Sequence, residues 1–319
     1  MFSYKNNQML TQAREARFQP KLILQILLFI AVYMVGTLVA SMIITIPTMV
    51  ALFTDHEIIS VMISGDIKAA ITAASSVMEK PWLMLLSLFV TAATTAACFI
   101  YCRKIEKRSF ISMGFRKQGW LARYLKGYVI GTIMLLLCAL ILWLMGDLDF
   151  AFAKNISVPY ILAFFIGFII QGMSEEVLVR GYFMVSLNNR CHTAVAVGIS
   201  SVVFALLHLA NPGISLLAMV NLTLFGVFMA VYILRTDDLF GACAIHSAWN
   251  FAQGNLVGIS VSGTAQLPTV AVMNPIGNNA LFHGGDFGLE GGLIVTFMLL
   301  TVILLTLFLP RKTQQTKSV

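Results

Sequence analysis

Charged residues are scarce in this chain: 11% of its 319 residues are Asp, Glu, Lys or Arg, against about 25% in an ordinary soluble domain. Hydrophobic residues make up 59%, and the mean hydropathy is +0.87. This composition excludes a soluble or disordered class and indicates an integral membrane protein. The apolar runs are continuous and close to 20 residues long, whereas a transmembrane barrel needs alternating segments of about ten. We therefore expect an all-α polytopic membrane protein, because a backbone in lipid must satisfy its own hydrogen bonds.

Cysteines are also few and unpatterned. The five are odd in number, are scattered through or beside apolar runs and show no CxxC spacing, which argues against a disulfide framework. A cleavable signal peptide is not expected either, because the apolar stretch Leu22–Phe53 is too long for one. The first span is therefore predicted to remain as an anchor.

Eight apolar segments have about the length that crosses a bilayer. They are Leu22–Leu52, Pro81–Tyr101, Tyr128–Leu144, Pro159–Leu187, Ala194–Ala210, Ser215–Leu234, Phe240–Ile259 and Gly292–Leu309. With a cytoplasmic N-terminus, 17 of the 21 Lys and Arg residues fall on the inner side, three on the outer side, and Arg180 within a span. The positive-inside rule then places both termini in the cytoplasm. The net charge of +7 is accounted for by orientation and does not indicate a nucleic-acid partner.

The spans divide the chain into five parts without an internal repeat. The predicted parts are a cytoplasmic tail (1–21), three N-terminal spans (22–158), a central core (159–259), a Gly-rich extracytoplasmic segment (260–291), and a last span with a basic tail (292–319). Residues 103–126 mix basic and aromatic side chains, which predicts either an amphipathic segment on the inner leaflet or a solvated basic loop. The segment 260–291 has no Lys or Arg and is predicted to be a structured loop, a lid or a partly re-entrant piece.

Three charges interrupt the fourth span, in the run Ser174-Glu175-Glu176-Val177-Leu178-Val179-Arg180. Each charge within a bilayer costs roughly 2.5–3.5 kcal/mol on insertion scales, so such residues are paired, lie in a wet cavity or do chemistry. Glu176 and Arg180 are four residues apart and can pair on one helix face. Glu175 has no basic partner at that spacing, which leaves it free to act as a general base or acid.

Two further spans carry polar groups at comparable depth. His208 follows Phe204 by one helical turn, and Asn250 follows His246 by one turn. At 1.5 Å per residue, Glu175, His208, His246 and Asn250 lie roughly 18, 21, 10 and 15 Å from the cytoplasmic ends of their helices. We therefore expect the four side chains to meet in one intramembrane cavity that opens toward the cytoplasm.

Two chemistries fit this set. In the first, Glu175, His208 and His246 hold a zinc ion that activates water. In the second, no metal is needed: Glu175 and His208 activate the water, while His246 and Asn250 donate hydrogen bonds to the oxyanion. Either scheme would hydrolyse an amide bond within the membrane.

The three motifs resemble those of the CPBP intramembrane proteases, also called the CAAX-protease and bacteriocin-processing (Abi) family. The family pattern EExxxR, FxxxH and HxxxN reads here as Glu175-Glu176…Arg180, Phe204…His208 and His246…Asn250, in order on three spans. The resemblance covers roughly Pro159–Ile259. It implies eight helices around a cytoplasm-facing cavity, with Glu175 activating water aided by His208, and His246 and Asn250 stabilising the oxyanion. It also implies that Glu176, Arg180 and Phe204 support the site, and it leaves metal and glutamate mechanisms open, although the family is often labelled metalloprotease.

The resemblance does not identify the substrate. It implies a peptide or lipidated protein at the membrane, in contact with membrane lipids, and the small loops are typical of a bacterial plasma-membrane protein. The alternative is a non-catalytic bacteriocin-immunity or scaffold protein that binds a peptide or partner. A proton-coupled transporter would also use intramembrane Glu and His, but the lack of repeats disfavours it.

Overall fold

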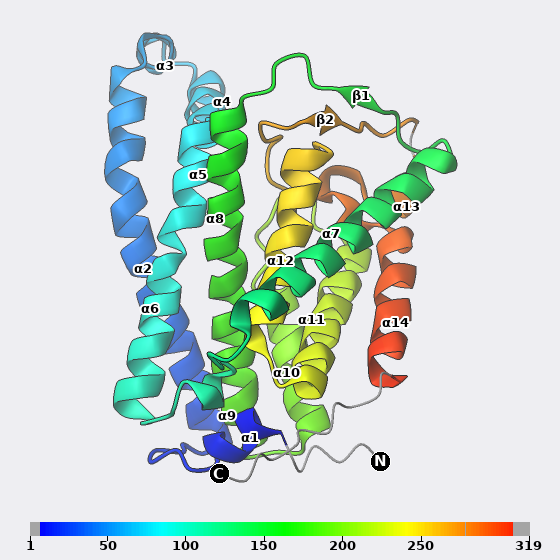
Figure 1. The fold of residues 1–319 in the computed structure, drawn as a ribbon. Coiled ribbons are helices and arrows are strands. Elements are labelled where there is room, and N and C mark those ends of the chain that lie inside the picture. The colour runs from blue at the N-terminus through cyan, green and yellow to red at the C-terminus, as the bar shows by residue number, and fades with distance from the viewer. Residues whose placement is uncertain (1–6, 278, 309–319) are drawn as a thin grey trace.

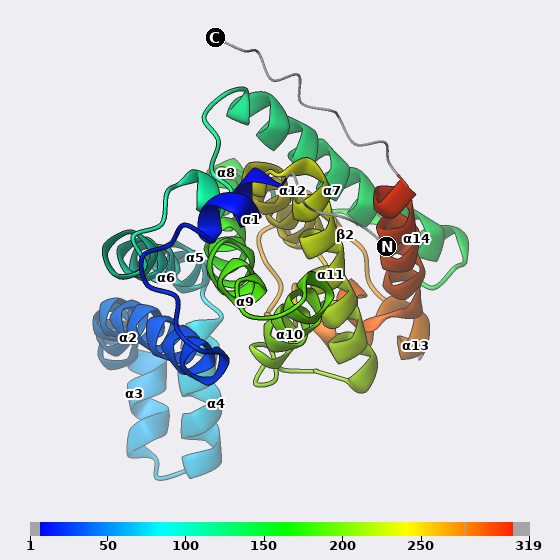
Figure 2. The same ribbon diagram turned by 90° about the horizontal axis from the view of Figure 1, so that it is seen from below.

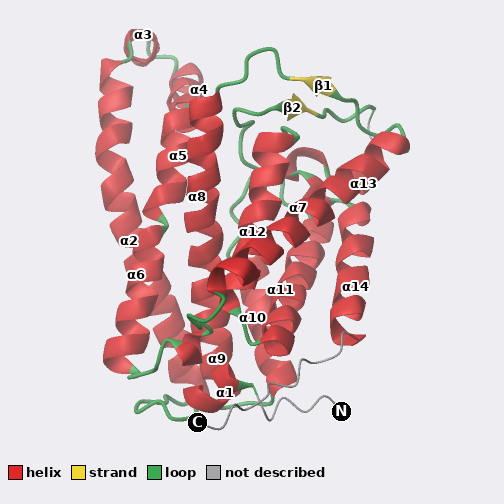
Figure 3. Cartoon of the chain, viewed as in Figure 1, coloured by secondary structure: helices red, strands yellow, loops and turns green. Residues whose placement is uncertain are grey.

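The structure is a computed structural model that describes residues 7–277 and 279–308. Figure 3 shows that helices form almost the whole of this part, and that the one small sheet joins β1 (Ala151–Phe152) to β2 (Ala271–Val272) in antiparallel register. β1 and β2 lie at one end of the helical bundle and the short helix α1 (Gln8–Ala13) lies at the other (Figure 1). The expected all-α membrane class is confirmed.

Five helical stretches in the described residues are long and apolar enough to cross a membrane. They are α2 (Leu22–Thr54), α5 (Pro81–Val90) with α6 (Ala92–Ile100) and η1 (Tyr101–Ile105), α7 (Trp120–Leu144), α8 (Val158–Glu176) with η3 (Val177–Met184) and α9 (Val185–Asn188), and α11 (Leu216–Thr236). Two of the other three expected spans coincide with shorter apolar helices, which are α10 (Thr193–Leu206) and α14 (Leu293–Phe308). The third coincides with α12 (Leu239–Phe251) and η4 (Ala252–Leu256). Each predicted segment thus coincides with a helix in the described residues, and five of the eight meet the length and hydropathy of a membrane span.

A helical pair that the sequence analysis did not predict connects α2 to α5. It consists of α3 (His56–Ile63) and α4 (Ile67–Met78), and it projects sideways from the bundle in Figure 2. Asp55 and Asp66 cap the two helices by accepting hydrogen bonds from main-chain N–H groups of the first turns. Lys80 directly precedes α5, and its Nζ lies 2.8 Å from Asp55 Oδ2. This ion pair connects the two helices to the bundle.

The start of the third predicted span needs correction. α7 begins at Trp120, eight residues earlier than expected, and crosses the bundle obliquely (Figure 1). The basic segment 103–126 consists of the end of η1, the single 3₁₀ turn η2 (Ile111–Met113), the turns on either side of η2 and the first residues of α7. The continuous apolar run begins later than α7 does, because the first residues of α7 from Trp120 onward have mixed polarity.

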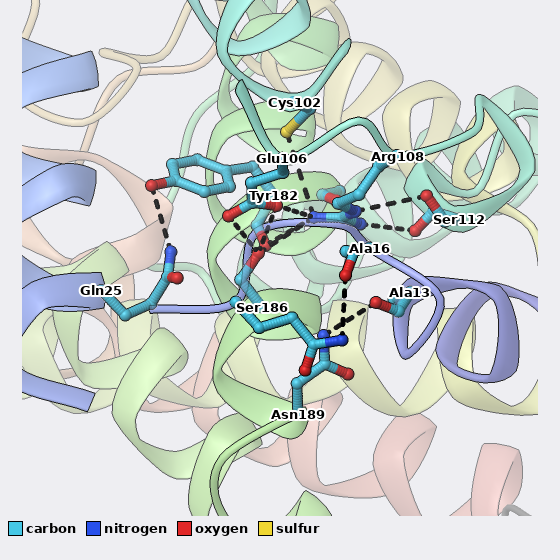
Figure 4. Close-up of polar contacts among 12 residues, drawn as sticks. Ala13, Ala16, Gln25, Cys102, Glu106, Arg108, Ser112, Tyr182, Ser186 and Asn189 are labelled. Atoms are coloured by element: carbon cyan, nitrogen blue, oxygen red, sulfur yellow. Dashed lines mark hydrogen bonds and ion pairs between the residues drawn. The ribbon is translucent and has the colours of Figure 1, made fainter. Parts of the chain in front are cut away.

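Arg108, expected at the membrane surface, is instead buried in a polar cluster that joins η1, η3 and α9 (Figure 4). Its guanidinium lies 3.3 Å from Glu106 Oε2 and donates to Ser186 Oγ at 3.0 Å and to the Gly181 carbonyl at 2.9 Å. Ser186 in turn donates to the Glu106 carboxylate. The cluster holds the π-helical stretch η3 against the loop that follows η1.

Residues 7–21, predicted only as a tail, are a packed part of the fold. Met9 is fully buried, and the main-chain N–H of Met9 donates to Asp237 Oδ1 at 3.0 Å. Asn189 Nδ2 donates to the Ala13 carbonyl at 2.9 Å, which ties α1 to the end of α9 (Figure 4). α1 therefore closes the end of the bundle opposite the small sheet.

α12 is the central helix, packed closely against both α7 and α8. A Cβ at Gly127 or Gly131 of α7 would overlap the main chain of α12, and a Cβ at Gly172 of α8 would lie 2.5 Å from Ser247 Oγ. These close approaches place His246, near the middle of α12, directly beside Glu176 at the end of α8. The small residues thus set the distance between the polar side chains.

Candidate active site

The predicted pair on the fourth span is present. Arg180 Nη1 lies 3.1 Å from Glu176 Oε1, and both side chains are fully buried. The guanidinium also lies over the Phe204 ring, 4.4 Å from its centroid, in a cation–π contact with α10. The EExxxR and FxxxH motifs are therefore in direct contact through Arg180 and Phe204.

His246 lies between the two glutamates. Its Nδ1 is 2.9 Å from Glu176 Oε1, and its Nε2 is 3.6 Å from Glu175 Oε2. Glu176 therefore does more than neutralise Arg180, because it also fixes the orientation of the imidazole. The ring is packed edge-on against Phe225 of α11, at a centroid distance of 5.0 Å.

Glu175 and Asn250 are joined by a residue that the sequence analysis missed. Gln171 of α8 donates through Nε2 to Glu175 Oε1 and accepts at Oε1 from Asn250 Nδ2 at 3.0 Å. The second Glu175 oxygen, Oε2, is buried and has no hydrogen-bond partner. Gln171 thus leaves one carboxylate oxygen of Glu175 free, on the side of His246.

His208 lies in the turn just after α10. Its Nδ1 is 2.9 Å from the carbonyl oxygen of Phe204, and its ring is 4.9 Å from the Phe204 ring. If Nδ1 donates to that carbonyl, Nε2 is the nitrogen left for chemistry. Phe204 thus positions both His208 and Arg180.

One cavity contains all four predicted residues. It comprises about 850 Å³ of empty space, its open mouth included, and Glu175, His208, His246 and Asn250 all line it. Aromatic and aliphatic side chains of α5, α8, α11 and α14 form most of its remaining wall. The prediction that the four residues meet in one cavity is confirmed.

The cavity wall also includes residues beyond the three motif-bearing spans. Ser262, Thr264 and Glu290, which belong to the connection between α12 and α14, line it. That connection lies toward the end of the bundle that carries β1 and β2, opposite α1 (Figure 1). Helical depth alone could not show this, because it locates residues along the spans and not in the connections between them.

One segment of the chain matches a known protein family. Residues 157–252 match the family model described as type II CAAX prenyl endopeptidase Rce1-like. The match supports the resemblance of this segment to the CAAX-protease family. The match contains all four cavity residues of the three motifs, and the remainder of the chain lies outside it. No curated protein and no solved structure matches the chain.

The residues of the Rce1-like segment do not fit the zinc hypothesis. Glu175 and His246 face each other, but no group of three or more His, Cys, Asp and Glu side chains in the described residues is arranged to hold a metal ion. His208 lines the same cavity without completing such a group.

Proposed function

We propose that this Rce1-like chain is an intramembrane endopeptidase that hydrolyses a peptide bond of a membrane-associated or lipidated peptide or protein. The observation that carries the proposal is the unpartnered Glu175 Oε2 facing His246 Nε2 in the wall of a largely apolar cavity. A carboxylate held in this way can bind and deprotonate a water beside the imidazole. The glutamate scheme is therefore preferred to the zinc scheme.

In the proposed reaction, Glu175 Oε2 accepts a proton from water as the water oxygen attacks the scissile carbonyl carbon. The negative charge moves from the carboxylate to the carbonyl oxygen, so the site must then stabilise an oxyanion. His246 can donate a hydrogen bond to that oxyanion from Nε2. The proton on Glu175 then passes to the leaving nitrogen as the C–N bond breaks, which regenerates the carboxylate.

Asn250 and His208 complete the proposed site. The Asn250 amide has two N–H groups, and the hydrogen bond to Gln171 occupies one of them. The second is available to the oxyanion, as the motif resemblance implies. His208, through Nε2, would orient the attacking water together with Glu175.

The membrane setting follows from the charge distribution. We propose that both termini are cytoplasmic and that the protein lies in a bacterial plasma membrane, because Lys and Arg concentrate on the side of the termini. The cavity wall extends toward the opposite end, so the substrate peptide would reach the site through the bilayer or from the outer side.

The deciding experiment compares wild type with Glu175→Gln in proteoliposomes. The change keeps the size of the side chain and removes the base. Cleavage of a prenylated C-terminal peptide and of membrane-peptide libraries is followed by mass spectrometry of new termini. We expect at least a hundredfold slower cleavage by the variant. Equal cleavage by the two proteins would exclude Glu175 as the base and leave the non-catalytic immunity or scaffold role.

A further inference from the structure

The cavity also has polar wall residues outside the three motifs, which are Asn211, Asn221, Ser262 and Glu290. Ser262 and Glu290 come from the connection between α12 and α14 and lie outside the segment that matches the Rce1-like family. The shared motifs therefore do not account for this part of the wall.

The Glu290 carboxylate is held firmly in place. It lies in the 3₁₀ turn η6 (Leu289–Gly291) and is 7% exposed. Gln253 Nε2 donates to Oε2, and Ser262 Oγ donates to Oε1 at 3.3 Å. Asn221 Nδ2 donates to the Glu290 carbonyl at 2.8 Å, which fixes the main chain. All of these donors are neutral groups, so the charge of the carboxylate is not neutralised by them.

Glu290 differs from the other buried acidic residues in lacking a cation. In the part of the chain that the structure describes, the buried residues Glu106, Glu176, Asp237 and Asp238 each pair with an arginine. No Lys, Arg or His among residues 7–277 and 279–308 forms such a pair with Glu290. Burial accordingly raises the pKa of Glu290 above its ordinary value. A buried carboxylate without a counter-ion is costly, and a cation in the cavity would remove that cost.

We propose that Glu290 is the counter-ion for a basic side chain of the substrate, an ammonium or guanidinium group held in the cavity. This inference rests on the proposed function, since the scissile bond is taken to lie at Glu175. The cavity that the two carboxylates share is also lined by Phe168, Leu222 and Leu267, which suit the aliphatic part of such a side chain. The cavity would thus recognise a peptide with a basic residue displaced along the chain from the cleavage site.

The first test measures selectivity. Peptides that carry one lysine at successive positions are compared with the same peptides carrying norleucine, which lacks the charge. For wild type we expect kcat/KM to favour lysine by about tenfold or more at one position, and Glu290→Gln to abolish that preference. Glu106→Gln is the matched control, because it neutralises a buried carboxylate outside the cavity, and it should keep the preference. Absence of a preference in wild type, or its persistence in Glu290→Gln, would overturn the proposal.

The second test does not depend on cleavage. Binding of the fluorescent lysine and norleucine peptides is measured by anisotropy in the Glu175→Gln background, with and without Glu290→Gln. We expect about tenfold tighter binding of the lysine peptide, lost in the double variant. A lysine preference in binding without any cleavage by wild type would refute the proposed function and support the cation site. Cleavage with no lysine preference in either assay would refute the cation site alone. If Glu290→Gln fails to accumulate, the kcat/KM values of wild type for the lysine and norleucine peptides decide whether the cavity prefers a basic side chain.

Discussion

Replacing Gln171 with leucine is expected to slow the proposed cleavage by about ten- to a hundredfold. The change removes the donor to Glu175 Oε1 and the acceptor for Asn250 Nδ2, while a side chain of similar size remains. A hydrogen bond to a charged group contributes about 1.5–3 kcal/mol. Each 1.36 kcal/mol of lost transition-state stabilisation costs a factor of ten in rate. The loss should appear mainly in kcat, because Gln171 orients the base rather than holding the bulk of the substrate.

The assay is the initial rate of peptide cleavage in proteoliposomes, with thermal unfolding measured on the same preparations. Gln25→Leu is the matched control, because Gln25 is a buried intramembrane glutamine that donates to Tyr182 Oη at 3.1 Å, outside the cavity. It should lower the stability to a similar degree and leave kcat within about twofold. The reasoning is refuted if Gln171→Leu keeps the wild-type kcat, or if Gln25→Leu loses as much.

Three further outcomes are expected. Glu176→Gln leaves the buried Arg180 without its carboxylate, so the free energy of unfolding should fall by about 3–5 kcal/mol, measured by denaturation in detergent; a change below 1 kcal/mol would contradict the pairing. Burial raises the pKa of Glu106 above its ordinary 4.5, so its contribution to stability is present below that value and is lost as the pH rises through the raised pKa. The melting temperature of Glu106→Gln should not decline in this way across the same pH range. A pH profile of the melting temperature identical to that of wild type would contradict the prediction. Exhaustive chelation should leave cleavage by wild type within twofold, whereas loss of activity and its recovery with zinc would favour the metal scheme.

The motif spacings were sufficient to predict the centre of the site. The i,i+4 relation paired Glu176 with Arg180, and similar helical depths brought Glu175, His246 and Asn250 to one cavity. Gln171 was missed, although a signal was present: it is a polar amide four residues before Glu175, on the same helix face.

Other features depended on contacts between distant parts of the chain. Arg108 reads as one of several surface cations, and only its pairing with Glu106 and Ser186 shows that it is buried. Glu290 lies in the Gly-rich segment 260–291, and its place in the cavity wall depends on contacts with Gln253 and Asn221, 37 and 69 residues away. Local periodicity carries no information on such long-range contacts, since it describes one helix at a time.

The cavity wall combines several stretches of the chain, among them the segment with the three motifs and the connection between α12 and α14. The residues proposed to break the bond lie within 157–252, whereas Ser262 and Glu290 lie in the connection before α14. Mutations in that connection can therefore alter which peptides are accepted without touching the hydrolytic residues. Proteins that keep the three motifs could therefore evolve different substrate specificities through changes in this connection alone. Exchanging the connection between two such proteins would be a direct way to exchange their substrate specificities.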